Sequence, residues 1–526
     1  MNKKNTILIE VIRNSFKSIA QQMNNNLARS AYTPIIYEMK DCSVAIFDKD
    51  INLLGESAGL PVFLGTLGPA VMAITDKYKT ESMKKGDIYI INDSYIVGSH
   101  LNDMTVVAPV FMKNLLVGFC ATKAHWMDIG AKSPSSATDS TDIYQEGYRI
   151  GPTKIYDKFK PNNEVLNILT DNSRMPKAVW GDLHAQISAC RIGESELEKL
   201  YIKYGYDLVT SINEIIFNKT EELETKAISR LNEGTWCSEG HLDSWGPGGD
   251  PVKVKTTITV KDGKITVSLK DSSPQTPGCL NCGKQQTIAG IRLAYKFIIE
   301  PSEPVNAGSF KNLEIDIPDN SVFNAKLPAA CQHYYPHIGL MIDLFMKSIS
   351  NATLDYIIAG QPGDAMNIMF TGNHPDTGEL FVSGEATGVG WGAHKGSNGE
   401  NGMMTYGGGD LKNFPVEVQE FKFPLLIHEY SLRKGSGGKG KWNGGMGLKR
   451  KYELLSDAKL STWFERTKTP GEGLQGGSNG LPGDVIVKYK NKNWKALKCA
   501  NVPLKKGTQV TIKTGGGGGF GQPQKK

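Results

Sequence analysis

Two histidines and an aspartate occur at a spacing that suits a metal site. In the segment NDSYIVGSHLNDMTVVAPVF, His100 lies three residues before Asp103, and His125 follows in LLVGFCATKAHWMDIG. The apolar runs in these segments predict two strands joined by a turn at 113–114, and the paired residues of such a hairpin have numbers that sum to about 227. Asp103 is then expected almost opposite Ala124, beside His125. The sequence therefore predicts that three potential ligands meet at the open end of one hairpin.

Two imidazoles and a carboxylate form a ligand set for a divalent transition metal. The set suits Zn²⁺, Mn²⁺ or Fe²⁺ and leaves coordination positions free for water and substrate, as in a catalytic rather than a structural site. Asp41 lies at the open end of another predicted hairpin and is a candidate fourth ligand. Asp128, in HWMD, is a candidate ligand or an acceptor for the second ring proton of a histidine. Glu146 is a further candidate partner, although a polar group of this kind often serves only the core.

The elements that must position these residues indicate an α+β chain with several domains. Periodic apolar residues predict a helix from Asn5 to about Tyr32, two hairpins follow, and a helix is expected over 64–85. We take residues 1–175 as an N-terminal α/β metal-site region. Residues 176–232 have helical spacing and are expected to form a central helical block.

The remainder of the chain, residues 233–526, is expected to be strand-rich. VKVKTTITV and KITVSLK flank the turn Asp262-Gly263, which is typical of a hairpin. Inserted helices are expected at about 286–299 and 336–350. Beyond residue 380 the chain is rich in glycine, and the glycine clusters are interpreted as loops between strands.

The composition is that of a globular protein. Of the 526 residues 39% are apolar and 22% are charged, which excludes a disordered chain. The net charge of +6 is spread over the whole length and argues against a nucleic-acid partner. No signal-peptide core occurs, and no apolar run approaches the roughly 18 residues that span a bilayer, so no membrane segment is expected. The eight scattered cysteines favour reduced thiols in a cytoplasm.

A series of motifs along the chain resembles one protein family. The metal-ligand segment is followed by AHWMDIGA, YQEGYRI and GDLHAQISA, and then by SPQTPGCLNC, FPVEVQEFKFPL, GSGGKGKWNGGMGLKR and TGGGGGFGQP. In this order they are similar to the hydantoinase B/oxoprolinase family from one end of the chain to the other. The motifs are specific to that family but not to one substrate within it.

The resemblance implies a subunit of a larger, hetero-oligomeric enzyme. Members pair with a hydantoinase A-type subunit that binds and hydrolyses ATP, so ATP and Mg²⁺ are expected on the partner. They include N-methylhydantoinase, oxoprolinase, caprolactamase and the acetone and acetophenone carboxylases. In the family the His-x-x-Asp pair and the later histidine bind a divalent metal. These positions are His100, Asp103 and His125 here, with Asp41 a ligand in some members.

The chain departs from the family pattern at two places. Many relatives have a histidine before Leu-Gly where this chain has Phe63. CQHYYPH at 331–337 replaces a more usual Val-Gly-rich sequence, so the substrate pocket is expected to differ. Within that segment, His333 and His337 are candidates for substrate contact or, less favoured, for a second metal site.

Three other patterns are interpreted as structural. GSGGKGKW at 435–442 nearly matches a phosphate-binding loop, but Trp442 replaces the hydroxyl that holds Mg²⁺ and no helix is expected to follow, so we expect no ATP site there. A tight backbone turn is the expected reason for the glycines at 515–519. Cys279 and Cys282 have C-x-x-C spacing without a second pair, and we expect free thiols on a loop.

The sequence thus predicts the metal-bearing subunit of an ATP-dependent cyclic-amide hydrolase that opens a hydantoin, lactam or 5-oxoproline-like ring. The partner would phosphorylate the ring carbonyl, and a metal-bound hydroxide would attack it, with Asp128 or Glu146 as the catalytic group that takes up the proton. Two alternatives stay open. One is a subunit of an ATP-dependent ketone carboxylase of the acetone or acetophenone type, and the other is a non-catalytic structural subunit.

Overall fold

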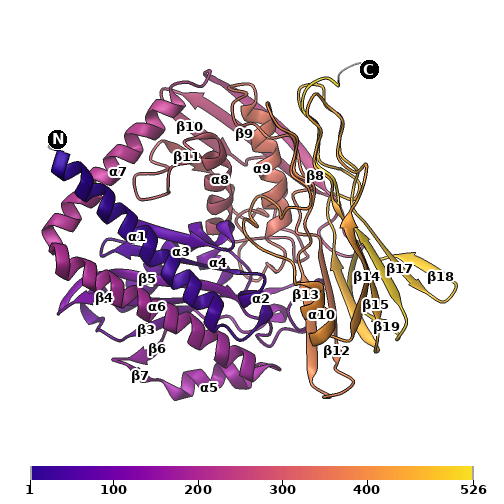
Figure 1. Ribbon diagram of the computed structural model, residues 1–526, viewed down its shortest axis with the longest axis horizontal. Helices are drawn as coiled ribbons and strands as arrows, with labels where there is room; N and C mark the ends of the chain where they lie inside the picture. Colours follow the sequence, from indigo (N-terminus) through magenta and orange to yellow (C-terminus); the bar gives the residue numbers. More distant parts are fainter. Residues whose placement is uncertain (1–2, 524–526) are drawn as a thin grey trace.

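The computed structural model describes residues 3–523, which form an α+β structure built on several sheets (Figure 1). The N-terminal sheet carries the predicted ligands and has the strand order β2-β1-β5-β4-β3-β6-β7. Its strands are β1 (Cys42–Asp48), β2 (Leu53–Ala58), β3 (Ile88–Ile91), β4 (Asp103–Met112), β5 (Leu115–His125), β6 (Thr153–Asp157) and β7 (Lys160–Pro161). Both hairpins predicted for this region, β1–β2 and β4–β5, are confirmed.

Helices cover both faces of the N-terminal sheet (Figure 1). They and the short turns of this half are α1 (Lys3–Ser30), α2 (Pro34–Tyr37), η1 (Pro61–Phe63), α3 (Leu64–Tyr78), η2 (Thr80–Ser82), α4 (Ser94–Val97), η3 (Ile143–Glu146), α5 (Asn163–Asp171), α6 (Pro176–Tyr204) and α7 (Tyr206–Ile228). On β3, Ile88 and Ile90 pack with α1 and α6, whereas Tyr89 and Ile91 pack with α3. Burial on both faces explains why these strands have nearly continuous apolar sequences.

One sequence-based expectation for this half needs adjustment. The helix expected over 64–85 ends at Tyr78, because Lys79 has a left-handed backbone (φ 52°) that stops the helix. The helical block contains α6 and α7, and α6 packs on β4 and β5 together with α1, so it belongs to the cover of the sheet. The division of the chain at 175 and 232 stays a prediction.

The β4–β5 register places the ligands one step closer than predicted. Met112 pairs with Leu115, as the expected sum of 227 requires, but a β-bulge at Val110 and Phe111 shifts the following pairs by one residue. Asp103 is therefore directly opposite His125 rather than opposite its neighbour.

A second sheet follows, with the order β11-β10-β9-β8, and α9 packs against it. The elements are β8 (Gly234–Leu242), β9 (Val252–Lys261), β10 (Lys264–Ser268), α8 (Lys284–Ile298), β11 (Leu313–Asp316) and α9 (Tyr335–Ile349). The hairpin around Asp262-Gly263 and the two inserted helices are as predicted. On β9 buried and half-exposed side chains alternate, because one face contacts the helix and the other faces solvent.

The C-terminal part consists of two further sheets, with the orders β13-β12-β16-β19 and β14-β15-β20-β17-β18. Its elements are β12 (Asn367–Asn373), β13 (Leu380–Glu385), α10 (Val416–Lys422), β14 (Leu425–Leu432), β15 (Leu448–Leu454), β16 (Ala458–Trp463), β17 (Asp484–Tyr489), β18 (Lys492–Lys495), β19 (Lys498–Leu504) and β20 (Gln509–Lys513). The strand-rich character predicted for this region is confirmed.

The glycines at 515–519 are needed for close packing rather than for a tight turn. They run through a bundle of other backbone segments: Gly517 donates to the carbonyl of Gly445, and its own carbonyl accepts from Gly438. A Cβ added at Gly517 would lie 1.9 Å from the carbonyl oxygen of Trp391. Only a residue without a side chain fits there, so the glycine-rich loops form the interior of the C-terminal region.

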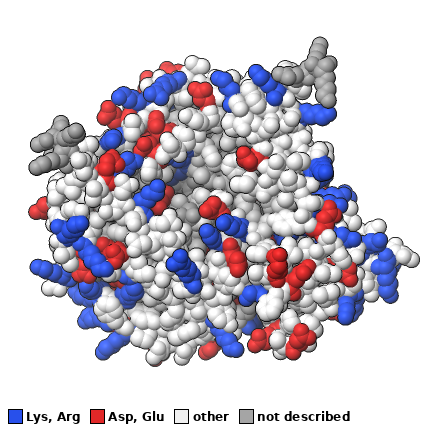
Figure 2. Space-filling model, viewed as in Figure 1, with Lys and Arg blue, Asp and Glu red and all other residues white. Residues whose placement is uncertain are grey.

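On the face shown in Figure 2, Lys and Arg side chains are interspersed with Asp and Glu. None of the helices between residues 3 and 523 combines the length and the apolar character that crossing a bilayer requires.

Candidate metal centre

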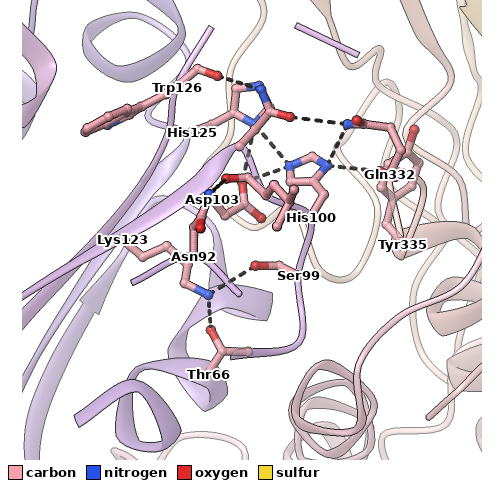
Figure 3. A network of polar contacts seen from close by, with 12 residues as sticks. Thr66, Asn92, Ser99, His100, Asp103, Lys123, His125, Trp126, Gln332 and Tyr335 are labelled. Atoms are coloured by element: carbon pink, nitrogen blue, oxygen red, sulfur yellow. Dashed lines mark hydrogen bonds and ion pairs between the residues drawn. The ribbon is translucent and has the colours of Figure 1, made fainter. Parts of the chain in front are cut away.

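His100, Asp103 and His125 converge at the mouth of the β4–β5 hairpin (Figure 3). Asp103 is the first residue of β4, His125 is the last residue of β5, and His100 lies in the turn before β4. His100 Nε2 is 2.8 Å from Asp103 Oδ1 and 3.1 Å from His125 Nδ1, and His125 Nδ1 is 3.3 Å from the same carboxylate oxygen. The hairpin thus holds two ring nitrogens and a carboxylate oxygen together.

The chemistry of this cluster fits a divalent cation. One donor atom from each of the three side chains lies within 4.8 Å of the others, and all three side chains are buried. Asp103 Oδ2 has no hydrogen-bond partner, and a buried carboxylate oxygen of this kind is costly unless a cation compensates it. Burial opposes ionisation of Asp103, but His100 and His125 hold the pKa of its carboxyl below the ordinary value. Asp103 is therefore ionised, as a metal ligand must be.

Asp41 borders the same cluster from the neighbouring strand. Its backbone carbonyl accepts a hydrogen bond from the amide of His125 (3.1 Å), because β1 pairs with β5 immediately beyond it. The Oδ1 atom of Asp41 is buried and has no partner, and burial raises the pKa of this carboxyl to about 6. Asp41 therefore offers a second carboxylate oxygen without a partner beside the triad, as a fourth metal ligand would.

A backbone carbonyl fixes the orientation of His100. Its Nδ1 lies 2.9 Å from the carbonyl oxygen of Gln332, and since a carbonyl can only accept, Nδ1 carries the proton and Nε2 is free to bind a metal. The side-chain amide of Gln332 also approaches Nδ1, at 3.1 Å, but an amide group can be turned to present either atom. The carbonyl therefore decides the tautomer.

Glu146 acts on the cluster through that backbone. Its carboxylate accepts from the amides of Cys331 and Gln332 (3.0 Å each) and from the hydroxyl of Ser140 (2.6 Å). Burial raises the pKa of Glu146 to about 7. Glu146 is absent from the residues that line the cavity at the cluster, so it is a positioning residue for the segment that orients His100.

The structure places Asp128 away from this role. Both of its carboxylate oxygens are engaged by Arg174, with 2.5 Å between Arg174 Nη2 and Asp128 Oδ1, and it does not line the cavity. This geometry favours a structural ion pair with Arg174 over a proton acceptor at the cluster.

Sequence reasoning missed the buried Lys123. Its ammonium group donates to the hydroxyls of Thr66 (2.7 Å) and Ser99 (3.1 Å), as Figure 3 shows. Burial lowers the pKa of Lys123 to about 8, although the charge of Asp103 opposes this shift. A lysine within an apolar strand was the available signal, because a strand buried on both faces leaves such a side chain no route to water.

The cluster opens into a cavity of about 140 Å³ that the two halves of the chain build together. Asp41, His100 and His125 line it from the N-terminal sheet. From the C-terminal half, His333 and Trp463 line it with stacked rings whose centroids are 3.8 Å apart.

His337 does not form a second metal site with His333. Its Nε2 lies 3.1 Å from Cys282 Sγ, and His337 is absent from the cavity lining, so the two histidines have different neighbours. Cys279 and Cys282 are free thiols on the segment before α8, as expected, but both are buried.

The model of the Hydantoinase B/oxoprolinase family matches residues 5–523 of this chain. The chain belongs to this family. An uncharacterised protein of Methanocaldococcus jannaschii is 34% identical over 524 residues, which are 99% of this chain and 91% of that protein. The caprolactamase subunit beta of Pseudomonas jessenii is 27% identical over 547 residues, covering 100% of this chain and 92% of the relative.

Solved structures show the same fold for this hydantoinase B family member. The crystal structure of the ATP-dependent caprolactamase from Pseudomonas jessenii matches with a TM-score of 0.91 at 24% identity, over 98% of this chain and 91% of that chain. The nucleotide-free structure of acetone carboxylase matches with a TM-score of 0.89 at 17% identity, over 98% and 76% of the two chains.

The departures from the family pattern lie at the cavity. Phe63 lines it, and the ring of Phe63 is 5.5 Å from the Nζ atom of Lys123. His333 belongs to the second divergent segment and lines it as well. The segment 435–442, which nearly matches a phosphate-binding loop, lies away from the cavity among the glycine-rich loops. Residues 435–447 contain no helix and lead into β15.

Proposed function

We propose that this chain is the metal-bearing subunit of an ATP-dependent hydrolase that opens a cyclic amide, namely a hydantoin, lactam or 5-oxoproline-like ring. The observation that carries the proposal is the buried triad of His100, Asp103 and His125, whose two histidines line a small cavity. A structural metal site has no need of such a space, whereas a catalytic site must admit substrate.

The residues of the chain would hold a Zn²⁺, Mn²⁺ or Fe²⁺ ion and orient its ligands. His100 would use Nε2, because its Nδ1 proton is held by the carbonyl of Gln332, and Asp41 would join the triad through its uncompensated Oδ1. A divalent ion bound there would supply Lewis acidity and lower the pKa of a bound water toward neutrality. Glu146 would keep the 331–332 backbone in place.

A cyclic amide needs activation first, because resonance makes its carbonyl carbon a poor electrophile. We assign this step to a hydantoinase A-type partner that phosphorylates the carbonyl oxygen with ATP and Mg²⁺. Two observations support the division of labour. A relative is named as a subunit beta, and the phosphate-loop lookalike of this chain has Trp442 in place of the hydroxyl and no following helix. The free cysteines of the described chain are consistent with a cytoplasmic complex.

A ketone carboxylase is the second candidate, and the fold match to acetone carboxylase is the observation that favours it. The same metal site would then polarise a ketone toward its enolate. A purely structural subunit is disfavoured, because the unpartnered Oδ atoms of Asp41 and Asp103 would destabilise the folded chain if no ligand bound to them.

The test has two measurements on the full chain. Metal content is determined for the wild type, for a His100→Ala/His125→Ala double variant and for His428→Ala, whose imidazole pairs with Glu453 on an exposed strand. We expect about one transition metal ion per chain in the wild type and the control, and loss of the ion in the double variant. Full occupancy in the double variant would refute the site.

The second measurement uses the complex of the chain with its ATP-binding partner. ATP-dependent opening of at least one ring in a panel of hydantoins and lactams is expected, and the double variant should abolish it. Bicarbonate-dependent carboxylation of acetone or acetophenone without any ring opening would instead assign the carboxylase function.

A further inference from the structure

One wall of the cavity carries two ring nitrogens that are buried without a partner; the hydroxyl of Ser136, which also lines the cavity, has no partner either. His333 Nε2 and Trp463 Nε1 are both buried without a hydrogen-bond partner, on stacked rings that line the cavity. An indole nitrogen can only donate. The imidazole can donate or accept, so its tautomer decides what the pair of rings would recognise.

A short hydrogen-bond chain favours one tautomer. In the orientation that the structure gives Asn367, its side-chain amide donates to the hydroxyl oxygen of Tyr335 (2.8 Å), which leaves the hydroxyl proton of Tyr335 to point to His333 Nδ1, 2.8 Å away. His333 Nδ1 is then the acceptor, and Nε2 carries the hydrogen. Both unpartnered groups on this wall are therefore N–H donors, and the missing partner is an oxygen or nitrogen acceptor.

The imidazole stays neutral in this setting. Burial lowers the pKa of His333 well below its ordinary value, and the nearby His100 and Lys498 disfavour a further positive charge. A neutral donor suits an uncharged acceptor such as an amide carbonyl.

The charged groups at the cavity disfavour an anionic ligand, because the cation behind its wall, Lys498, is already paired with Glu465. The charged carboxyl side chains that line it are Asp41 and Glu385, and no lysine or arginine belongs to the lining. Glu385 is already paired with the buried Arg450 at 2.7 Å. With Asp41, Asp103 and a divalent cation the site is close to neutral overall. An additional carboxylate on the substrate would be buried without a counter-ion, which is costly.

The size and walls of the cavity set the dimensions of the ligand. Phe63, Tyr334, Tyr406 and Trp463 contribute aromatic surface, and the volume of about 140 Å³ is close to the ~150 Å³ of an apolar protein cavity that accommodates benzene. One five- to seven-membered ring fits this space.

On these grounds we infer that the enzyme selects uncharged, single-ring amides, and that His333 is the residue that recognises them by donating its Nε2 hydrogen to an acceptor of the ring. The inference rests on the proposed function and narrows it, because it favours simple lactams and hydantoins over rings that bear a carboxylate. His333 is a specificity residue on the wall of the site, supported by Tyr335 and Asn367 behind it.

The probes are a matched pair that differ by one carboxylate: 2-pyrrolidinone and 5-oxoproline. Their dissociation constants are measured by ligand-observed NMR titration of the full chain saturated with Zn²⁺. We expect 2-pyrrolidinone to bind the wild type at least about tenfold more tightly than 5-oxoproline. His333→Phe keeps the ring that stacks on Trp463 but removes the donor, and it should weaken 2-pyrrolidinone binding about tenfold, as the loss of one hydrogen bond of about 1.4 kcal/mol implies.

Two further variants make the result specific. Tyr335→Phe removes the group that favours this tautomer and should weaken binding by a smaller factor. His337→Phe alters a buried histidine of the same segment that does not line the cavity, and binding should be unchanged. Circular dichroism and thermal melting confirm that each variant is folded.

The outcomes separate this inference from the function on which it rests. Equal or tighter binding of 5-oxoproline would overturn the selection of uncharged rings, and wild-type affinity in folded His333→Phe would overturn the role of His333. Failure of both probes to bind would also count against it. If 2-pyrrolidinone binds in a His333-dependent way but the complete complex with ATP opens no ring, the hydrolase function fails while the recognition site stands.

Discussion

Replacing Glu146 by alanine tests whether the segment at 331–332 positions the metal ligand. In the wild type, the carboxylate accepts from the amides of Cys331 and Gln332 and from the hydroxyl of Ser140, all of them buried. Glu146→Ala leaves these donors without an acceptor. Each buried donor left unpaired costs about 1–3 kcal/mol, so the free energy of unfolding should fall by about 2–5 kcal/mol after some relaxation.

The same change should weaken metal binding. The carbonyl of Gln332 holds the Nδ1 proton of His100, and it moves if the adjacent amide loses its anchor. Loss of an orienting partner typically costs 10–100-fold in metal affinity, or about 1.4–2.7 kcal/mol. Glu146→Gln retains one carbonyl oxygen that can accept from the two backbone amides. Its free energy of unfolding and its metal affinity should therefore fall much less than those of Glu146→Ala.

The measurements are zinc affinity by competition with a chromophoric chelator and denaturant unfolding of the metal-free chain. If Glu146→Ala is folded and binds zinc as tightly as the wild type, the positioning argument is refuted. The pH dependence gives a second check. The pKa of Glu146 is raised from 4.5 to about 7, so the folded state binds the proton more tightly than the unfolded state does. Its contribution is fully present below pH 4.5 and is lost as the pH rises to about 7, an effect of about 3 kcal/mol that Glu146→Gln should remove.

Three further predictions follow from other parts of the structure. Gly517→Ala should lower the free energy of unfolding in urea by about 3 kcal/mol or more, because the new Cβ would lie 1.9 Å from the carbonyl oxygen of Trp391. Gly151→Ala is the control: a Cβ there would meet nothing within 4 Å, so the free energy of unfolding should change by less than about 0.5 kcal/mol. The purified chain alone should not hydrolyse ATP, and activity should appear when the partner is added; hydrolysis by the isolated chain at the rate of the complex would contradict this. In the complete complex, ¹⁸O at the scissile carbonyl of the substrate should pass to inorganic phosphate, and mass spectrometry that finds all of the label in the product carboxylate would exclude phosphorylation of the carbonyl.

The local hydrophobic pattern of the sequence was enough to predict the β4–β5 hairpin and the proximity of Asp103 and His125 at its open end. The period of two in the strands and the position of the turn are properties of neighbouring residues, so Asp103 and His125 could be paired from the sequence. The bulge at Val110 was not visible, because a bulge depends on how a strand packs rather than on its own composition.

Features that depend on contacts between distant segments could not be predicted. Glu146 meets residues that follow it by 185 and 186 positions, and the glycines at 515–519 contact segments from 360 to 481. A glycine that makes room for another backbone has the same sequence signal as one in a turn, so only the fold distinguishes them. Lys123 was overlooked for the same reason, since its hydroxyl partners come from another helix and another loop.

The unpartnered buried groups at the cavity are of two kinds, and each kind comes from a different part of the chain. On the N-terminal side they are the carboxylate oxygen of Asp41 and, just behind the lining, that of Asp103, both of which require a cation or a donor, together with the hydroxyl of Ser136, which can donate or accept. On the side of the C-terminal half they are the N–H groups of His333 and Trp463, which require an acceptor. No direct contact between the two walls can satisfy both across a cavity of about 140 Å³. A cation at the first wall would offset the two carboxylates, and a carbonyl-bearing ring at the second would supply an acceptor for the two N–H groups. The division of polar groups between the two walls therefore favours a metal ion and an uncharged amide as joint occupants.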